Sequence, residues 1–253
     1  MAQKEFNRKK KVSIILPNYN SYKYVDATIK SIISQTYKNW ELIIVDDCSD
    51  DKTKTKLLKY KNNLRIKIYW LKKNKGAAYC RNFAISKSKS DYLAFIDSDD
   101  IWEREKIKLQ LNFMKKNNYN FTYTYYKTFD QKTKKVNPQT KYDFNSFTKD
   151  TSIATSTMMI KKKITKGVKF TNTKICEDYY FKCKILKKIP YAHCLKNYLS
   201  KYRLRKDSLQ SNKFKNFYWI WKINNKYNKF SFIKNMISLF FISLSSIKKY
   251  GLK

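Results

Sequence analysis

The first half of the chain alternates short, nearly continuous apolar runs with amphipathic segments. The apolar runs have the length and composition of parallel strands buried on both faces, and they span residues 12–16, 41–46, 64–71 and 91–97. The segments between them place apolar side chains at helical spacing, over residues 22–36, 51–61 and 76–89. Because strands and helices that alternate at this spacing form right-handed crossovers, the pattern predicts an α/β fold with a doubly wound, mostly parallel sheet in the first half.

The second half of the chain shows a less regular pattern. Residues 119–129 are an aromatic-rich strand candidate, residues 153–162 are mixed in polarity, and a helix is predicted to begin near Glu177. Two further helices are predicted in the C-terminal part. We expect these segments to be additions that complete a site built on the sheet.

Composition and charge narrow the function classes. The chain has 253 residues, with 56 Lys and Arg against 19 Asp and Glu, for a formal net charge of +37. Such an excess suits a nucleic acid or an anionic membrane surface, although abundant Lys, Asn, Ile, Tyr and Phe are equally typical of AT-rich codons. Five cysteines without a CxxC pair and a single histidine, His193, exclude the usual zinc spacings and predict reduced thiols in the cytoplasm. The apolar run after the basic N-terminus is too short for the core of a signal peptide.

Carboxylates are concentrated where two of the predicted strands end. Asp97, Asp99 and Asp100 follow the fourth strand, and Asp46 and Asp47 follow the second. Ligands bind beyond the carboxyl ends of strands in open α/β sheets, and a divalent cation keeps several close carboxylates ionised. Oxygen ligands favour Mg²⁺ or Mn²⁺. The alternative is a helix N-cap for residues 103–116, with Asp100 as the capping residue.

Several segments together resemble family 2 glycosyltransferases with a GT-A fold, a Rossmann-like, mostly parallel sheet flanked by helices. The chain looks most like bacterial enzymes of teichuronic acid, capsule and lipopolysaccharide synthesis, and the resemblance covers residues 11 to about 212. The segments are VSIILPNYN, SIISQTYKNWELIIVDDCSDD, NKGAAYCRN, DYLAFIDSDDIW, ATSTMMIKK, EDYYFKCKIL and YRLRKDSLQSNK. The resemblance implies a catalytic domain at 1–212, with a nucleotide-binding half at about 11–118 and an acceptor half at about 119–212. A helical tail would follow at 213–253.

The resemblance implies a metal-dependent site for a nucleotide sugar. Asp97-Ser98-Asp99 looks like the DxD motif of the family, in which the second carboxylate, here Asp99, holds Mg²⁺ or Mn²⁺ on the diphosphate and Asp97 lies nearer the ribose. Both are expected at the metal. Asp47, with Asp46 beside it, would contact the base and favour uracil.

Three further residues complete the donor site that the resemblance implies. Pro17 and Tyr19, in the loop after the first strand, would frame the base and ribose. Arg81 would lie near the diphosphate, although an arginine on the solvent-exposed surface fits its position in the sequence as well.

The resemblance also assigns the acceptor side. Asp178 matches the catalytic base of the family, which would remove the proton of the attacking hydroxyl in an inverting transfer. The alternative is that Asp178 is the N-cap of the helix that runs to Leu186. Arg203 and Arg205 resemble a loop that folds over the diphosphate, although Arg205 stands where many relatives have His.

These features predict transfer of a sugar from a UDP-linked donor to a hydroxyl of a surface polysaccharide or of its lipid carrier. Two other functions remain open from the residues alone. A phosphohydrolase of the haloacid dehalogenase type also uses a DxD motif, although normally after its first strand. A basic nucleic-acid-binding protein could use aromatic residues 119–126 as a stacking platform, but no motif predicts a specific nucleic acid.

The C-terminal segment from Phe230 to Ile247 has one apolar helical face, formed by Ile233, Met236, Ile237, Phe240, Phe241, Leu244 and Ile247. Its charges and serines argue against a membrane-spanning helix. Two alternatives remain open: a helix lying on the anionic inner face of the cell membrane, or a helix packed on the catalytic domain or on a second copy in a homodimer.

Overall fold

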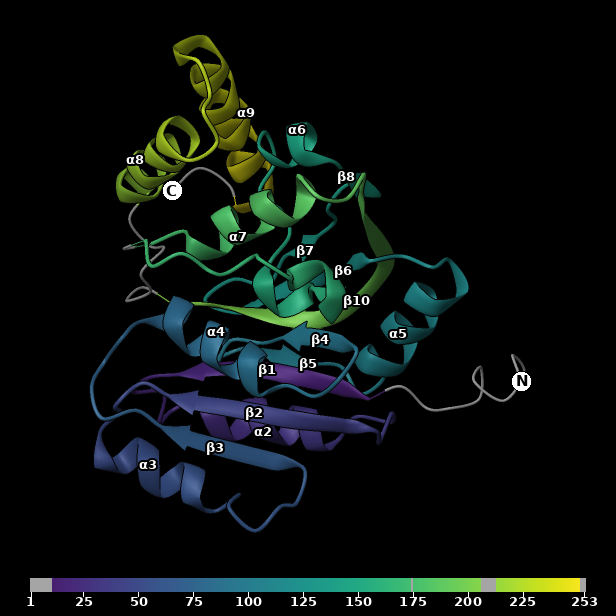
Figure 1. The fold of residues 1–253 in the computed structure, drawn as a ribbon, viewed down its shortest axis with the longest axis vertical. Helices are drawn as coiled ribbons and strands as arrows, with labels where there is room; N and C mark the ends of the chain where they lie inside the picture. The colour runs from purple at the N-terminus through teal and green to yellow at the C-terminus, as the bar shows by residue number, and fades with distance from the viewer. Residues whose placement is uncertain (1–10, 174, 206–212, 251–253) are drawn as a thin grey trace.

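The structure, a computed structural model, describes residues 11–173, 175–205 and 213–250. A mixed sheet runs through the molecule in the strand order β3-β2-β1-β4-β9-β6-β10-β5, with β7 paired to β6 and β8 to β10 (Figure 1). The strands are β1 Val12–Asn18, β2 Trp40–Asp46, β3 Ile66–Trp70, β4 Tyr92–Phe95, β5 Ile101–Trp102, β6 Phe121–Asp130, β7 Lys135–Val136, β8 Lys141–Tyr142, β9 Met159–Lys161 and β10 Ala192–Leu204.

The predicted parallel sheet is present in the first half. β1 pairs in parallel with β2 and with β4, and β2 pairs in parallel with β3. Every residue of β1 and β2 is buried, as continuous apolar runs require. β3 is an edge strand with mostly half-exposed residues, so the expectation of burial on both faces is wrong for this strand.

Helices cover both faces of the sheet. Their bounds are α2 Val25–Ile33, α3 Asp51–Leu58, α4 Ala77–Lys87, α5 Lys106–Lys116, α6 Phe144–Phe147, α7 Glu177–Leu186, α8 Lys213–Lys226 and α9 Phe232–Tyr250, with the 3-10 turns η1 Thr155–Thr157 and η2 Lys162–Thr165. One core cluster joins α2, α3 and α5 to the face that carries Ile14, Leu16 and Ile44. The other joins α4 and α7 to the opposite face, through Ile15 and Val45. Successive side chains of each central strand therefore pack into two hydrophobic cores, one on each face of the sheet.

The sheet does not end with the first half of the chain, so the expectation of a sheet confined to that half is wrong. β9 lies antiparallel between β4 and β6, and β10 runs parallel to β6 with register shifts between Leu195 and Ser200. These pairings join segments distant in sequence through backbone hydrogen bonds, and mixed polar and aromatic patterns do not specify their partners. The site predicted at the end of β4 therefore lies in the middle of the sheet rather than at its border.

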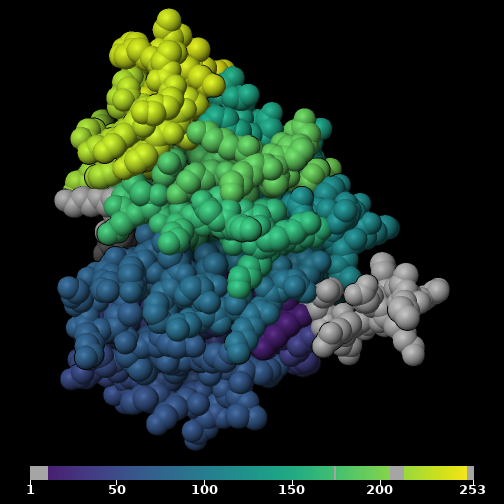
Figure 2. All heavy atoms as spheres, viewed as in Figure 1, coloured from purple at the N-terminus to yellow at the C-terminus, as the bar shows by residue number. Residues whose placement is uncertain are grey.

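The two C-terminal helices pack on each other at one end of the molecule. Figure 1 shows α8 and α9 at the end opposite to β3 and α3, and Figure 2 shows them as a projection coloured yellow. Among the residues that the structure describes, no helix has the length and hydrophobicity needed to cross a bilayer. The predicted domain boundary at residue 212 falls outside the described residues.

Candidate active site at the carboxyl ends of β1, β2 and β4

Asp46 ties the end of β2 to the end of β1. Its carboxylate accepts hydrogen bonds from Asn18 Nδ2 at 2.7 Å, from Ser49 Oγ at 2.6 Å and from Ser49 N at 3.0 Å. Asp46 is fully buried. Because protein donors occupy both of its oxygens, this residue shapes the loop after β2.

Asp47, the next residue, holds the loop that leads into α4. One of its carboxylate oxygens accepts from Lys75 N at 2.7 Å and the other from Gly76 N at 2.8 Å. Gly76 has φ of +84°, a conformation that favours glycine, and it directly precedes the first turn of α4. Each oxygen of Asp47 keeps a second lone pair, so the carboxylate can still accept from a ligand.

The two residues predicted to frame a base lie at the end of β1. Pro17 lies within β1, opposite Val45, and not in the following loop as predicted, because the parallel pairing continues to Asn18. Tyr19 comes directly after the strand and is 53% exposed. Its side chain is thus available to a ligand at the carboxyl end of β1.

The three carboxylates after β4 have different surroundings. Asp99 forms an ion pair with Arg205 at 3.3 Å, and burial together with the charge of Asp97 raises the pKa of Asp99 to about 6. Asp100 is fully buried and accepts hydrogen bonds from Ser156 Oγ and, at 2.9 Å, from Arg203 N. Burial first, and then the neighbouring carboxylates, raise the pKa of Asp100 well above its ordinary range.

The N-cap alternative for Asp100 is therefore wrong. Helix α5 begins at Lys106, its N-cap Glu105 makes no side-chain capping bond, and the amide of Ile107 in its first turn donates to Gln35 Oε1 at 3.0 Å. The short strand β5 separates Asp100 from the helix. The carboxylate of Asp100 instead joins the loop after β4 to Ser156 of η1 and to Arg203 of β10.

Arg81 connects the carboxylates after β4 to the start of α7. Its Nη2 lies 2.7 Å from Asp97 Oδ1, and its Nη1 lies 2.6 Å from Glu177 Oε1. The guanidinium is only 6% exposed and lies over the ring of Phe170. Burial alone would lower the pKa of Arg81, but the two carboxylates outweigh it and raise the pKa, so the group stays charged. The surface-exposed alternative for Arg81 is wrong.

Asp178 lies beside Glu177 in the first turn of α7. Its Oδ2 accepts hydrogen bonds from Lys182 Nζ at 2.7 Å and from Thr155 Oγ1 at 2.9 Å. Burial alone would raise the pKa of Asp178, but the charge and hydrogen bond of Lys182 dominate and hold it well below its usual range. The carboxylate is ionised at neutral pH.

The N-cap alternative for Asp178 is wrong as well. The N-cap of α7 is Cys176, whose left-handed backbone, with φ of +61°, directs the next two residues into the first turn. Left-handed backbone at a residue other than glycine is costly and is often found at functional sites. The carboxylate of Asp178 bonds to side chains of α7 and η1, not to the free amides of the helix.

The end of β10 brings two arginines to the same edge. Arg203 Nε donates to the carbonyl of Asp99 at 2.9 Å, and its Nη1 pairs with Asp130 at 3.2 Å. The guanidinium groups of Arg203 and Arg205 both face the ring of Tyr24. Both predicted arginines therefore reach the DxD segment.

The residues present fit a divalent cation of the Mg²⁺ or Mn²⁺ type. Asp97 and Asp99 provide carboxylate oxygens, the ligands that these hard cations prefer. No group of three or more His, Cys, Asp or Glu side chains within residues 11–173, 175–205 and 213–250 is placed to hold a metal alone. Mg²⁺ is commonly held by one or two carboxylates together with substrate phosphates, and the raised pKa of Asp99 indicates a carboxylate that gains from a cation.

Sequence reasoning missed several residues of this site. Glu177 has no role in the sequence prediction, yet it shares Arg81 with Asp97. Lys182 was not singled out, although its position four residues after Asp178 on a predicted helix is a readable signal. The sequence does not predict the contacts of Ser156 and Thr155 with Asp100 and Asp178, because these contacts depend on where η1 packs.

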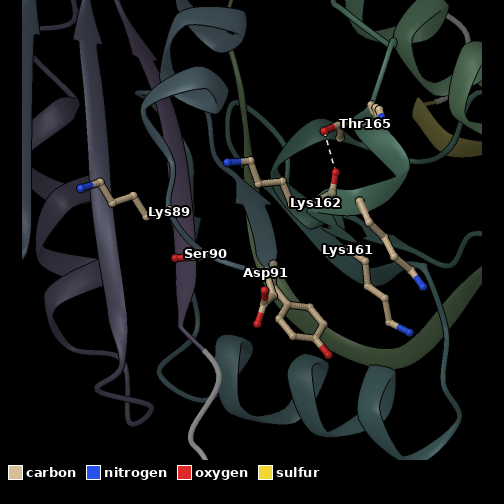
Figure 3. A pocket seen from close by; sticks show the side chains of 9 residues that line it. Lys89, Ser90, Asp91, Lys161, Lys162 and Thr165 are labelled. Atoms are coloured by element: carbon tan, nitrogen blue, oxygen red, sulfur yellow. Dashed lines mark hydrogen bonds between the residues drawn. The ribbon is translucent and has the colours of Figure 1, made fainter.

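A pocket of about 620 Å³ lies elsewhere and is lined by Lys89, Ser90, Asp91, Tyr92, Lys161, Lys162, Lys163, Thr165 and Lys166. Figure 3 shows Lys161, Lys162 and Thr165 across from Ser90 and Asp91. Asp91 precedes β4, whereas Asp97 follows it. The pocket is thus at the opposite end of this strand from the predicted site.

Comparison with solved structures identifies the fold. The chain matches the crystal structure of residues 1–349 of Staphylococcus aureus TarS in complex with UDP-GlcNAc with a TM-score of 0.74, at 22% identity, over 94% of this chain and 73% of that one. It also matches the mannosyltransferase PcManGT of Pyrobaculum calidifontis, in complex with GDP-Man and Mn²⁺, with a TM-score of 0.71, at 13% identity, over 97% of this chain and 72% of that one. The predicted GT-A fold is confirmed.

Comparison of sequences identifies the family. The chain is 34% identical over 233 residues to TuaG of Bacillus subtilis, named for teichuronic acid biosynthesis, covering 90% of this chain and 92% of TuaG. It is 38% identical over 218 residues to WfgD of Escherichia coli, named as a UDP-Glc:α-D-GlcNAc-diphosphoundecaprenol β-1,3-glucosyltransferase, covering 84% of each chain. The sequence profile described as glycosyl transferase family 2 matches residues 13–187. With this match and these relatives, the chain belongs to glycosyl transferase family 2.

Proposed function

We propose that this enzyme is an inverting, metal-dependent glycosyltransferase that moves a sugar from a UDP-linked donor to a hydroxyl of a polysaccharide precursor or a lipid-linked saccharide. The domain would comprise residues 1–212, followed by the helical tail 213–253. Membership of the family contradicts the two alternatives, a phosphohydrolase and a nucleic-acid-binding protein.

The observation that carries the proposal is the bridge made by Arg81. One buried guanidinium contacts both Asp97, in the DxD segment, and Glu177, next to Asp178. An inverting transfer needs a base on the side of the anomeric carbon opposite the leaving diphosphate. The bridge fixes a donor-side carboxylate and an acceptor-side carboxylate in one rigid network, which supports this division of roles.

The donor is assigned to the edge formed by β1, β2 and β4. Asp47 would accept a hydrogen bond from the imide nitrogen of uracil, while Pro17 and Tyr19 would frame the base and ribose. Asp46 would act on the nucleotide through the loop that it holds. The TarS structure contains UDP-GlcNAc, which supports a UDP donor, whereas the PcManGT structure contains GDP-Man.

Asp99 and Asp97 would hold Mg²⁺ or Mn²⁺. When bound, the cation would supply positive charge to the diphosphate leaving group. Arg203 and Arg205 would add positive charge from β10, since both already contact the DxD segment. Arg81 would hold the carboxylate of Asp97 in place.

Asp178 would remove the proton of the acceptor hydroxyl. Its low pKa keeps the carboxylate charged and able to accept, and Lys182 and Thr155 fix its orientation. A carboxylate is a weak base toward an alcohol. Proton transfer would therefore follow bond formation to the anomeric carbon, which acidifies the attacking hydroxyl.

The relatives support an acceptor at the cell envelope. WfgD is named for a diphosphoundecaprenol-linked acceptor and TuaG for teichuronic acid, and the chain covers most of both proteins. We place the enzyme in the cytoplasm, at the inner face of the membrane, where such carriers would be elongated.

A thermal-shift screen of nucleotides tests the proposal. UDP with Mn²⁺ at about 100 times its dissociation constant should raise the melting temperature by about 5–10 °C. GDP with Mn²⁺ and UDP without metal should give smaller shifts. A variant with Asp47→Asn serves as a control for the base, because it should lose the preference for UDP. Equal shifts with UDP and GDP, or no shift with UDP and Mn²⁺, would refute the donor assignment.

A further inference from the structure

Helix α9 packs on the protein through its polar side chains. Ser238 Oγ donates to the carbonyl of Thr148 at 2.5 Å, and Ser245 Oγ donates to Asp150 at 2.7 Å. Asn235 Nδ2 donates to the carbonyl of Trp221 at 3.0 Å. Asn235 and Ser238 are both buried. The inner face of this helix is thus held by hydrogen bonds, with Ile242 as its buried apolar residue.

The apolar face of α9 points away from the protein. All seven residues of the predicted apolar stripe are exposed, at between 40% and 71%: Ile233, Met236, Ile237, Phe240, Phe241, Leu244 and Ile247. Phe232 of the same helix is 68% exposed. A surface helix normally buries its apolar stripe, and contiguous exposed apolar surface marks an interaction site. The helix thus packs on the catalytic domain, as one of the predicted alternatives has it, but through its polar side and not through this stripe.

A lysine pocket adjoins this stripe. It has a volume of about 640 Å³, and it is lined by Phe241 and Leu244 of the stripe. Four lysines, Lys135, Lys149, Lys248 and Lys249, line it as well, together with one acid, Asp150. Apolar side chains beside an excess of lysines form the combination that an anionic lipid needs, with its phosphate in the pocket and its acyl chains against the helix.

Charge distinguishes between the two partners that could cover this surface, a second copy of the chain and a membrane. The stretch from Lys213 to Tyr250 contains eight lysines and no Asp or Glu. Two copies that packed through α9 would bring these like charges together, which disfavours a symmetric dimer. An anionic bilayer surface, in contrast, attracts lysines while its apolar interior accepts the exposed stripe.

We propose that the outer face of α9, with the adjoining lysine pocket, is a docking surface for a membrane that contains anionic phospholipid. The helix lies in the plane of the interface, with Phe240 and Ile233 at the level of the acyl chains and Lys248 at the level of the phosphates. This inference stands on the geometry of α9 and does not depend on the identity of the donor or of the acceptor.

Sedimentation of the full chain with vesicles tests the proposal. The wild type should bind vesicles of phosphatidylcholine with phosphatidylglycerol, and it should bind weakly to phosphatidylcholine alone. The triple variant Ile233→Ser, Phe240→Ser, Leu244→Ser should lose binding by at least about tenfold, because three large apolar side chains no longer enter the bilayer. These side chains are exposed, so thermal melting should be unchanged.

Two further variants make the test specific. Leu58→Ser with Leu64→Ser is the matched control. Both leucines are exposed and lie between the end of α3 and the start of β3, at the end of the molecule opposite to α9 (Figure 1), so their replacement should leave binding intact. A lysine variant, Lys135→Gln with Lys149→Gln and Lys248→Gln, should weaken binding to the anionic vesicles and leave the weak binding to phosphatidylcholine unchanged. High salt should have the same effect on the wild type.

Two outcomes would overturn the proposal. One is binding of the triple variant that equals that of the wild type. The other is a wild type that fails to bind vesicles and elutes as a dimer, while the triple variant elutes as a monomer, because the apolar face would then contact a second copy.

Discussion

Replacement of Asp178 by Asn tests whether this residue is the base or only the ion-pair partner of Lys182. An amide cannot accept the proton of the acceptor hydroxyl, so sugar transfer should fall by about 10² to 10⁴. Asp178 is on the acceptor side, so the affinity for UDP with Mn²⁺ should stay close to that of the wild type. Asn can still accept the hydrogen bond from Thr155.

The same substitution should also destabilise the protein. Lys182 is 3% exposed and pairs with Asp178 at 2.7 Å, so Asp178→Asn leaves a buried charge without its partner. Removal of one member of a buried pair costs about 3–5 kcal/mol of unfolding free energy. A loss of activity in this variant alone would therefore be ambiguous.

A double-mutant cycle separates the two effects. Lys182→Met removes the second charge, so the double variant Asp178→Asn, Lys182→Met should regain most of the lost stability, because neutral packing often replaces a buried pair at little cost. Transfer should not recover. Glu105→Gln is the control, because it breaks an exposed pair with Lys108; it should leave transfer unchanged and lower the free energy of unfolding by no more than about 1 kcal/mol.

The assays are UDP release in the presence of acceptor, UDP titration by calorimetry, and chemical unfolding. Near-normal transfer in Asp178→Asn would remove this residue as the base. Recovery of both stability and transfer in the double variant would show that Asp178 acts only through Lys182. Either result would direct the search to Glu177.

Three other perturbations follow from the same contacts. Asp99→Asn should remove the gain in UDP affinity that Mn²⁺ gives and leave the metal-free affinity unchanged. Since the pKa of Asp99 is about 6, protonation should reduce this gain in the wild type by about tenfold per pH unit below 6, and an equal gain in variant and wild type at every pH would contradict the assignment. Arg81→Lys should lower transfer by about 100-fold, because an ammonium cannot hold both Asp97 and Glu177, whereas Arg65→Lys on the surface should not. Burial would raise the pKa of Glu41, but hydrogen bonds from Lys67 and Ser13 outweigh it and lower this pKa from 4.5 to about 2, so the ionised carboxylate stabilises the fold by no more than about 3 kcal/mol above pH 4.5 and loses this contribution as the pH falls toward 2. Acid unfolding of Glu41→Gln should therefore depend less steeply on pH than that of the wild type, and identical unfolding curves would refute this reasoning.

The fold of the first half was predictable because its strands are unambiguous. Continuous apolar runs such as 12–16 are stable only in the interior of a sheet, and each is followed by an amphipathic segment of helical length. The second half was not predictable to the same extent. Its strands pair across long stretches of sequence, and β6 and β10 mix polar and aromatic residues that fit several neighbours.

The site shows the same division. The clustered carboxylates at 97–100 are visible in the sequence, because several charges after a buried strand need a compensating partner. Which partner each one has is decided by the fold. Asp97 meets Arg81, Asp99 meets Arg205, and Asp100 meets Ser156, and these partners are 16, 106 and 56 residues away along the chain.

Helix α9 shows what the sequence alone determined and what only the tertiary structure decided. Helical periodicity is local, so the sequence determined that Ile233, Phe240 and Leu244 share one face. The sequence could not determine which face would be buried, because that depends on the partners offered by distant segments. Thr148 and Asp150 offer hydrogen-bond acceptors to the serines of α9, and the fold therefore buries the polar face and leaves the apolar face outward.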